Sequence, residues 1–88
     1  MIRRRAIVRG HVQGVFFRDS ARRLAQEVAV SGSARNLDDG SVELLLEGET
    51  GAVEQLLAWA HTGPDAASVE SVEVQEQVPQ GVAGFDAG

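Results

Sequence analysis

The 88-residue sequence contains no cysteine and no lysine, and both absences exclude whole classes of site. Without cysteine the chain can form no disulfide, no thiolate nucleophile and no cysteine-ligated metal centre. Without lysine it cannot contain the Gly-x-x-x-x-Gly-Lys-Ser/Thr phosphate loop, and the Gly-x-Gly-x-x-Gly pattern of dinucleotide-binding folds is also missing. No apolar run is long enough to span a bilayer, and no apolar signal-peptide segment follows the basic residues after Met1. We therefore expect a cytoplasmic protein that does not contact membranes.

Charge is distributed unevenly along the chain, although the net charge is only −5. All eight basic residues are arginines, and they lie between Arg3 and Arg35. Eleven of the thirteen acidic residues follow Asn36, with no basic residue among them. An anionic ligand is therefore attracted to the first half of the chain. The negative total disfavours a surface that follows the phosphates of a nucleic acid, and two separated histidines, His11 and His61, predict no metal site.

The composition is typical of a folded globular protein, with 43% hydrophobic and 24% charged residues. A chain of 88 residues has room for one hydrophobic core, so we predict a single domain over residues 1–88. A domain of this length buries only about 60–65% of the surface of its unfolded chain, and we therefore expect modest stability.

Apolar spacing predicts elements in the order β-α-β-β-α-β, followed by a short last strand. Each helix shows one apolar stripe at i, i+3, i+4 and i+7, and the continuous apolar run of the first strand predicts a central position. This order is typical of the ferredoxin-like split βαβ arrangement, an α+β fold with an antiparallel sheet and both helices on one face. The predicted strands are Arg3–Arg9, Ser33–Leu37, Ser41–Glu47, Val69–Val78 and Val82–Phe85, and the predicted helices run from about Asp19 to Val30 and from about Thr50 to His61.

Local signals predict where these elements begin and end. Asp19 or Ser20 can cap the first helix, and Ser31–Gly32 can end it. Asp38–Gly40 predicts a tight hairpin turn, because glycine adopts a left-handed conformation at little cost.

The stretch Gly10–Arg18 follows the first strand and leads into the first helix. Gly14 can adopt a positive φ, so this loop can turn several backbone N–H groups toward one point. The helix N-terminus adds unpaired N–H groups, and Arg18 adds a planar charged fork that suits phosphate oxygens. The combination predicts an anion-binding loop, and the alternative is a tight turn with Arg18 as a surface charge. Of Phe16 and Phe17, we expect one to be buried and one to lie near the mouth of the site.

Asn36 ends the second predicted strand, which this topology can bring beside the loop that follows the first strand. Its amide group has one acceptor oxygen and two donor hydrogens. Beside a bound anion it could hold one water molecule in line with a phosphorus atom. The sequence also allows Asn36 to cap the turn at Asp39 or Gly40.

Two stretches resemble the signatures of the acylphosphatase family. Gly10–Arg18 is similar to the first signature, Gly-x-Val-Gln-Gly-Val-x-Phe/Tyr-Arg. Gly32–Asn36, followed by Gly40–Val42 and Gly48, resembles the second. Both occur in the right order at compatible spacing, and the resemblance spans about Arg4–Val78.

The resemblance implies an enzyme that hydrolyses the carboxyl–phosphate bond of small-molecule acyl phosphates without a metal or other cofactor. Carried over residue by residue, Arg18 matches the family's phosphate-binding arginine and Asn36 matches its water-positioning asparagine. We expect the enzyme to be a monomer. The implied phosphate-binding loop comprises Gln13, Gly14, Val15, Phe16, Phe17 and Arg18.

Three departures from the family pattern stand out. Ser33 lies where an aromatic residue is usual, and Ala29 lies where a helix-ending glycine is frequent. The tail Gly84–Gly88 lacks the usual apolar and basic ending. We expect these residues to lower stability or to change the preferred acyl group before they abolish catalysis.

A non-catalytic anion- or nucleic-acid-binding ferredoxin-like module is the alternative. RNA binding on the sheet face requires aromatic side chains at strand centres, and the predicted strands from Ser33 to Val78 contain none. A maturation or regulatory module is a further alternative, because acylphosphatase-like modules also occur within larger carbamoyl-transfer proteins.

Overall fold

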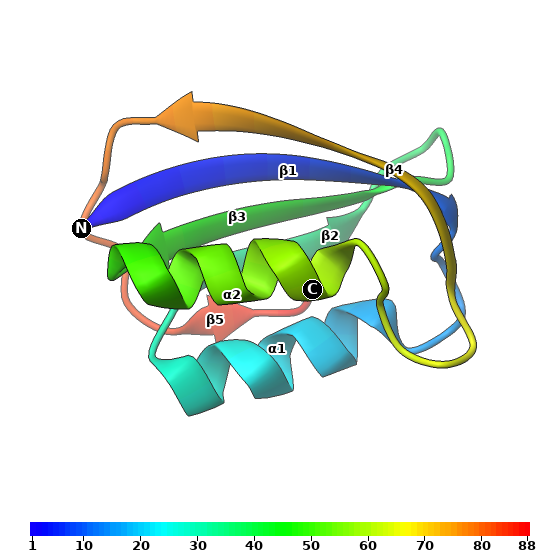
Figure 1. The fold of residues 1–88 in the computed structure, drawn as a ribbon, viewed down its shortest axis with the longest axis horizontal. Helices are drawn as coiled ribbons and strands as arrows, with labels where there is room; N and C mark the ends of the chain where they lie inside the picture. Colours follow the sequence, from blue (N-terminus) through cyan, green and yellow to red (C-terminus); the bar gives the residue numbers. More distant parts are fainter.

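The order of elements predicted from the sequence is confirmed in the computed structural model, which covers residues 1–88. Four long strands and two helices form the β-α-β-β-α-β core, and a two-residue strand is added at the end (Figure 1). The elements are β1 (Ile2–His11), α1 (Phe17–Val28), β2 (Ser31–Asn36), β3 (Val42–Gly48), α2 (Thr50–Ala60), β4 (Ser68–Gln77) and β5 (Phe85–Asp86).

The sheet has the strand order β4-β1-β3-β2-β5, and both helices cover the same face of it (Figure 1). Strand β1 lies between β4 and β3, as its continuous apolar run predicts. The pairs β1–β3, β1–β4 and β2–β3 are antiparallel, which confirms the ferredoxin-like arrangement. The short strand β5 runs parallel to β2, so the sheet as a whole is mixed.

The hydrophobic core lies between the sheet and the helices, because alternate residues of β1 and β3 point to the helical face. The apolar stripe predicted for each helix meets this face. Phe17 is the largest fully buried side chain, and its ring lies 4.9 Å from that of Trp59. Neither helix has the length and apolarity needed to cross a bilayer. Fully buried core residues include Ala6, Val8, Ala21, Ala25, Val42, Leu44, Leu46, Val53, Leu56 and Ala60.

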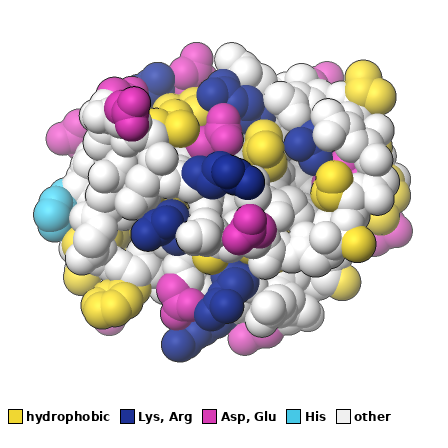
Figure 2. Space-filling view, turned by 180° about the vertical axis from the view of Figure 1, so that it is seen from behind, with side chains coloured by type: hydrophobic (Ala, Val, Ile, Leu, Met, Phe, Trp, Pro, Cys, Tyr) yellow, Lys and Arg dark blue, Asp and Glu magenta, His cyan; other side chains and the backbone are white.

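The face of the sheet opposite the helices is covered by ion pairs between neighbouring strands. Arg5 pairs with Glu43 at 2.8 Å, and Arg9 pairs with Glu73 at 3.2 Å. Arginine and acidic side chains lie next to one another over the middle of this face (Figure 2). Pairs that are partly or largely exposed add little stability, but they neutralise the arginines on this face.

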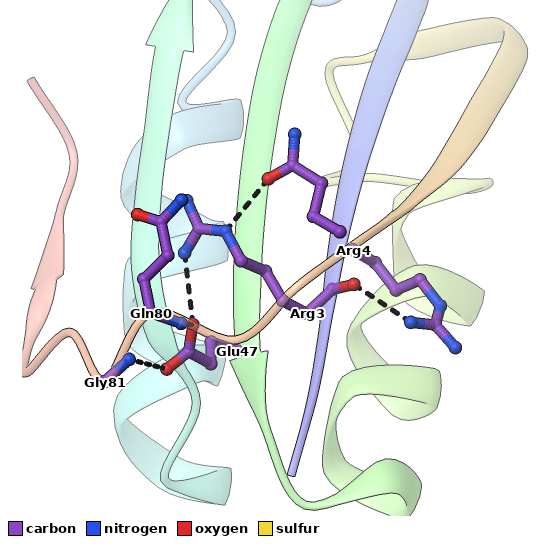
Figure 3. Close-up of polar contacts among 6 residues, drawn as sticks. Arg3, Arg4, Glu47, Gln80 and Gly81 are labelled. Carbon is purple, nitrogen blue, oxygen red and sulfur yellow. Dashed lines mark hydrogen bonds and ion pairs between the residues drawn. The ribbon is translucent and has the colours of Figure 1, made fainter.

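Glu47 is a buried acid on β3 that holds the segment between β4 and β5. Its carboxylate accepts hydrogen bonds from the backbone N–H groups of Gln80 and Gly81, both at 2.7 Å, and from Arg3 at 3.3 Å (Figure 3). The N–H of Gln80, followed by that of Gly81 and by Arg3, lowers the pKa of Glu47 below its ordinary value against the opposing effect of burial. The chain can therefore cross from β4 to the other edge of the sheet, where β5 pairs with β2.

The ends of α1 differ from the sequence prediction. The helix begins at Phe17, and Phe16 occupies the N-cap position with φ 64° and no side-chain cap. Asp19 does not cap the helix, because it lies inside the first turn, where it pairs with the arginines three and four residues later. Ser20 is likewise inside the helix. The helix ends at Val28, so Ser31 and Gly32 belong to β2 rather than to the helix end.

Ala29 ends α1 in the left-handed conformation, with φ 60° and ψ 43°, and its N–H donates to the carbonyl of Ala25. This conformation costs an L-residue about 1–2 kcal/mol, whereas glycine adopts it readily. The glycine that the family often has at this position is thus explained by the geometry.

The last strand also differs: it covers Phe85–Asp86 rather than Val82–Phe85, because pairing with β2 begins only at Phe85.

We expect Ala29→Gly to stabilise the protein by about 0.5–1 kcal/mol, since it relieves the left-handed strain at the end of α1. Urea unfolding of both proteins measures the difference. Ala58→Gly provides the control: Ala58 is exposed within α2, where glycine should instead destabilise by roughly 0.5–1 kcal/mol. A loss of stability in Ala29→Gly would contradict this account of the helix end.

Candidate active site

The side chain of Gln13 joins the loop after β1 to the β2–β3 hairpin. Its amide nitrogen donates hydrogen bonds to the carbonyl oxygens of Leu37, at 2.8 Å, and Ser41, at 2.9 Å. These two residues close the loop of the hairpin, where the Leu37 N–H donates to the Ser41 carbonyl at 2.9 Å. Gln13 therefore brings together the two signatures that the sequence shows separately.

Two left-handed residues shape the loop between β1 and α1. Gly14 has φ 74°, as expected from its sequence position, and Phe16 has φ 64°. The backbone hydrogen bonds outside helices and strands include none donated by residues 13–19, and the first one in α1 runs from the Ser20 N–H to the Phe16 carbonyl at 3.0 Å. The loop and the first turn of α1 thus present unpaired N–H groups together with the positive end of the helix dipole.

The two phenylalanines of the loop divide as predicted. Phe17 is only 1% exposed and packs in the core, where it fixes the start of α1. Phe16 is 78% exposed and lines a cavity beside the loop. Packing of the Phe17 ring in the core therefore anchors the loop, while the Phe16 ring stays exposed beside the cavity.

Arg18 differs from every other arginine of the chain, because it alone has no carboxylate partner. The other seven arginines pair with aspartate or glutamate at 2.6–3.8 Å. Arg18 is half-buried, and its Nη1 donates to the backbone carbonyl of Ala87 at 3.3 Å. A permanent cation next to unpaired N–H groups, with no carboxylate at ion-pair distance, favours the binding of an anion.

Asn36 is exposed at the end of β2 and lines the same cavity as Arg18. The turn beyond it does not need its side chain as a cap. The Gly40 N–H donates to the Leu37 carbonyl at 3.2 Å, and Asp39 caps the turn by accepting hydrogen bonds from the N–H and hydroxyl of Ser41. The Ser41 hydroxyl and then its N–H lower the pKa of Asp39.

The cavity between these parts has a volume of about 520 Å³ and is open to solvent. Of the loop residues predicted from the sequence, Gly14, Phe16, Phe17 and Arg18 line it. Val15 is buried in the core, and the Gln13 side chain turns to the hairpin, so neither side chain borders the cavity. The structure therefore brings Arg18 and Asn36 to one site from two different elements.

Several lining residues are missed by sequence reasoning. Arg22 lies one turn after Arg18, and this i, i+4 spacing on one helix face is a signal that could have indicated it. Asp19 also lines the cavity, but Arg22 at 2.6 Å and Arg23 at 3.1 Å pair with it. The tail residues Asp86–Gly88 complete the wall, and no sequence pattern places them there.

The three departures from the family pattern have different positions. The tail lines the cavity, so it can influence what binds. Ser33 is buried in β2 outside the cavity and is paired with Asp86, while Ala29 lies at the far end of α1. No group of three His, Asp or Glu side chains is placed to hold a metal ion.

The fold is a ferredoxin-like α+β arrangement, and its first strand–helix loop lines a cavity together with Arg18 and Asn36. Comparison with known proteins gives the family. The model of the acylphosphatase family matches residues 4–87, and the chain belongs to that family.

Individual relatives agree with this assignment. The acylphosphatase of Rubrobacter xylanophilus is 55% identical over 83 residues, which cover 93% of this chain and 76% of the relative. The crystal structure of the Bacillus subtilis acylphosphatase matches with a TM-score of 0.96 at 32% identity, covering 100% of this chain and 99% of that one. Thermococcus kodakarensis HypF matches at a TM-score of 0.85 and 30% identity, but the matching part is only 12% of that protein.

We expect Gln13→Met to destabilise the protein by about 1–3 kcal/mol, because the two carbonyls of the hairpin lose a donor while the side-chain volume is nearly kept. It should also weaken phosphate binding, since the hairpin that carries Asn36 is no longer fixed to the loop that carries Arg18. Urea unfolding and calorimetric titration with phosphate measure the two effects. Gln26→Met is the matched control, because Gln26 is exposed on α1 and should change stability by less than about 0.5 kcal/mol. Equal effects of the two substitutions would contradict the joining role of Gln13.

Proposed function

We propose that this protein is an acylphosphatase that hydrolyses acyl phosphates to a carboxylate and inorganic phosphate. The observation that carries the proposal is the position of Arg18. It is the one arginine without a carboxylate partner, and it lies beside unpaired N–H groups in a cavity that Asn36 also lines. Family membership supports the same activity.

The phosphoryl group binds to the loop and Arg18. The guanidinium fork of Arg18 and the N–H groups of residues 14–18 donate hydrogen bonds to the phosphoryl oxygens, where negative charge is concentrated. In doing so, Arg18 exchanges the neutral carbonyl of Ala87 for a charged acceptor, and a charge-assisted hydrogen bond is stronger.

Asn36 positions the attacking water on the side of the phosphorus opposite the acyl oxygen. The water oxygen forms a bond to phosphorus while the bond between phosphorus and the acyl oxygen breaks, and the carboxylate leaves with that electron pair. One water proton passes to a phosphoryl oxygen and the other stays on the attacking oxygen, so the products are a carboxylate and dihydrogen phosphate, which can release a proton to solvent. The protein supplies positioning and charge stabilisation and needs no nucleophile of its own.

The reactivity of the substrate makes this simple site sufficient. An acyl phosphate is an activated anhydride with a carboxylate leaving group, so the reaction requires neither a protein base nor a covalent intermediate. Preorganised donors around the phosphoryl group are typically the largest contribution to such catalysis.

A nucleic-acid-binding module is less well supported than a hydrolase. The sheet face that would stack bases carries interstrand ion pairs, including Arg5–Glu43 and Arg9–Glu73 (Figure 2). These pairs neutralise the arginines that a polyanion would need. The unpaired charge of Arg18 lies instead in a cavity sized for a small ligand.

The monomeric state expected from the sequence stays a prediction, and so does the cytoplasmic location.

Turnover of benzoyl phosphate in the presence of EDTA tests the proposed activity. We expect the parent protein to release benzoate and phosphate, and Arg18→Ala and Asn36→Ala each to lose on the order of 10²–10³ in kcat/KM, because each removes one preorganised contact. Circular dichroism and unfolding curves verify that the variants are folded.

Arg23→Ala is the matched control for charge, since Arg23 lies on the same helix, is largely exposed and does not line the cavity. It should retain the activity of the parent. A folded parent that binds phosphate through Arg18 but releases no benzoate would confirm the anion site and exclude the hydrolase.

A further inference from the structure

Phe16 is a large apolar side chain that the fold itself does not use. Its ring is 78% exposed, and the residue is not part of the hydrophobic core. Its backbone has φ 64° and ψ 21°, a left-handed conformation that L-residues other than asparagine and aspartate rarely adopt. Neither burial nor local conformation explains a phenylalanine at this position.

Glycine would satisfy the backbone here without strain, as it does at Gly14 in the same loop. The chain instead combines two unfavourable features, a strained backbone and an apolar ring in water. Strain of this kind tends to lie at functional sites, where the side chain serves a ligand rather than the fold.

The ring lines the cavity that holds Arg18 and Asn36. The other large apolar residues of the lining, Val12 and Phe17, are each only 1% exposed and offer a ligand little surface. Phe16 is therefore the one large apolar side chain of the lining that a bound molecule can touch.

The site also fixes which part of the substrate meets this ring. Arg18 and the N–H groups of the loop hold the phosphoryl group, so the acyl group, joined to it through one oxygen, extends toward the exposed mouth of the cavity. Phe16 lies between Gly14 and Arg18 in the chain and reaches that mouth.

We infer that Phe16 is a specificity-determining residue that contacts the acyl group, so that the site favours acyl phosphates with flat, apolar acyl groups over those with small acyl groups. The inference rests on the proposed function and deepens it. Contact between an aromatic ring and a flat apolar group is favourable because both lose surface to water.

The test compares benzoyl phosphate with acetyl phosphate, because selectivity is the ratio of their kcat/KM values. We expect Phe16→Ala to lower the benzoyl-to-acetyl ratio by roughly tenfold relative to the parent. Phe16→Tyr retains the ring and should keep the ratio. Val78→Ala removes a similarly exposed apolar side chain that does not line the cavity. It should leave kcat/KM unchanged for both substrates.

Phe16→Gly separates specificity from folding. It removes the ring and relieves the left-handed strain, so it should lower the ratio as Phe16→Ala does, with a Tm at or above that of Phe16→Ala. If Phe16→Ala lowers kcat/KM equally for both substrates, the benzoyl-to-acetyl ratio is unchanged and the inference is overturned.

A binding measurement distinguishes failure of this inference from failure of the proposed function. Phenylphosphonate and methylphosphonate carry the same anionic head with and without a ring. The parent should bind phenylphosphonate more tightly, and Phe16→Ala should remove that preference even if the protein hydrolyses neither acyl phosphate. An absent preference in the parent would overturn the role of Phe16, whereas absent turnover with the preference retained would overturn only the hydrolase.

Discussion

The site depends on the two hydrogen bonds that the Gln13 amide donates to Leu37 and Ser41. They fix a loop with left-handed residues to a hairpin from another part of the chain. The loop supplies unpaired N–H groups and Arg18, and the hairpin supplies Asn36. The proposed mechanism works by positioning and charge stabilisation, so it requires such fixed geometry, because a small displacement of either part costs much of the rate.

The distribution of charged side chains supports the proposed anion site at Arg18. The basic half and the acidic half of the chain are interleaved in the sheet, where β1 lies between β3 and β4. Most arginines consequently find carboxylates on neighbouring strands or on the same helix, and only Arg18 is left without one. The chain has a net charge of −5, yet it keeps one cation available for a ligand.

Much of this could be predicted from the sequence, because periodicity and turn residues are local signals. They predicted the element order, the conformation of Gly14 and the contrast between Phe16 and Phe17. They could not show that Phe16 occupies the N-cap position of α1, since local propensity favours a polar residue there. The tail at the cavity was also missed, because Glu47 and β5 place it through contacts distant in sequence.

Hydrolysis of benzoyl phosphate in water labelled with heavy oxygen tests the central claim most directly, that water positioned by Asn36 attacks the phosphorus of the phosphoryl group held by Arg18. Mass spectrometry of the two products shows which atom the water attacked. The account predicts that the label appears in inorganic phosphate and that benzoate is unlabelled. Label in benzoate would show attack at the carbonyl carbon and would contradict the role given to Asn36.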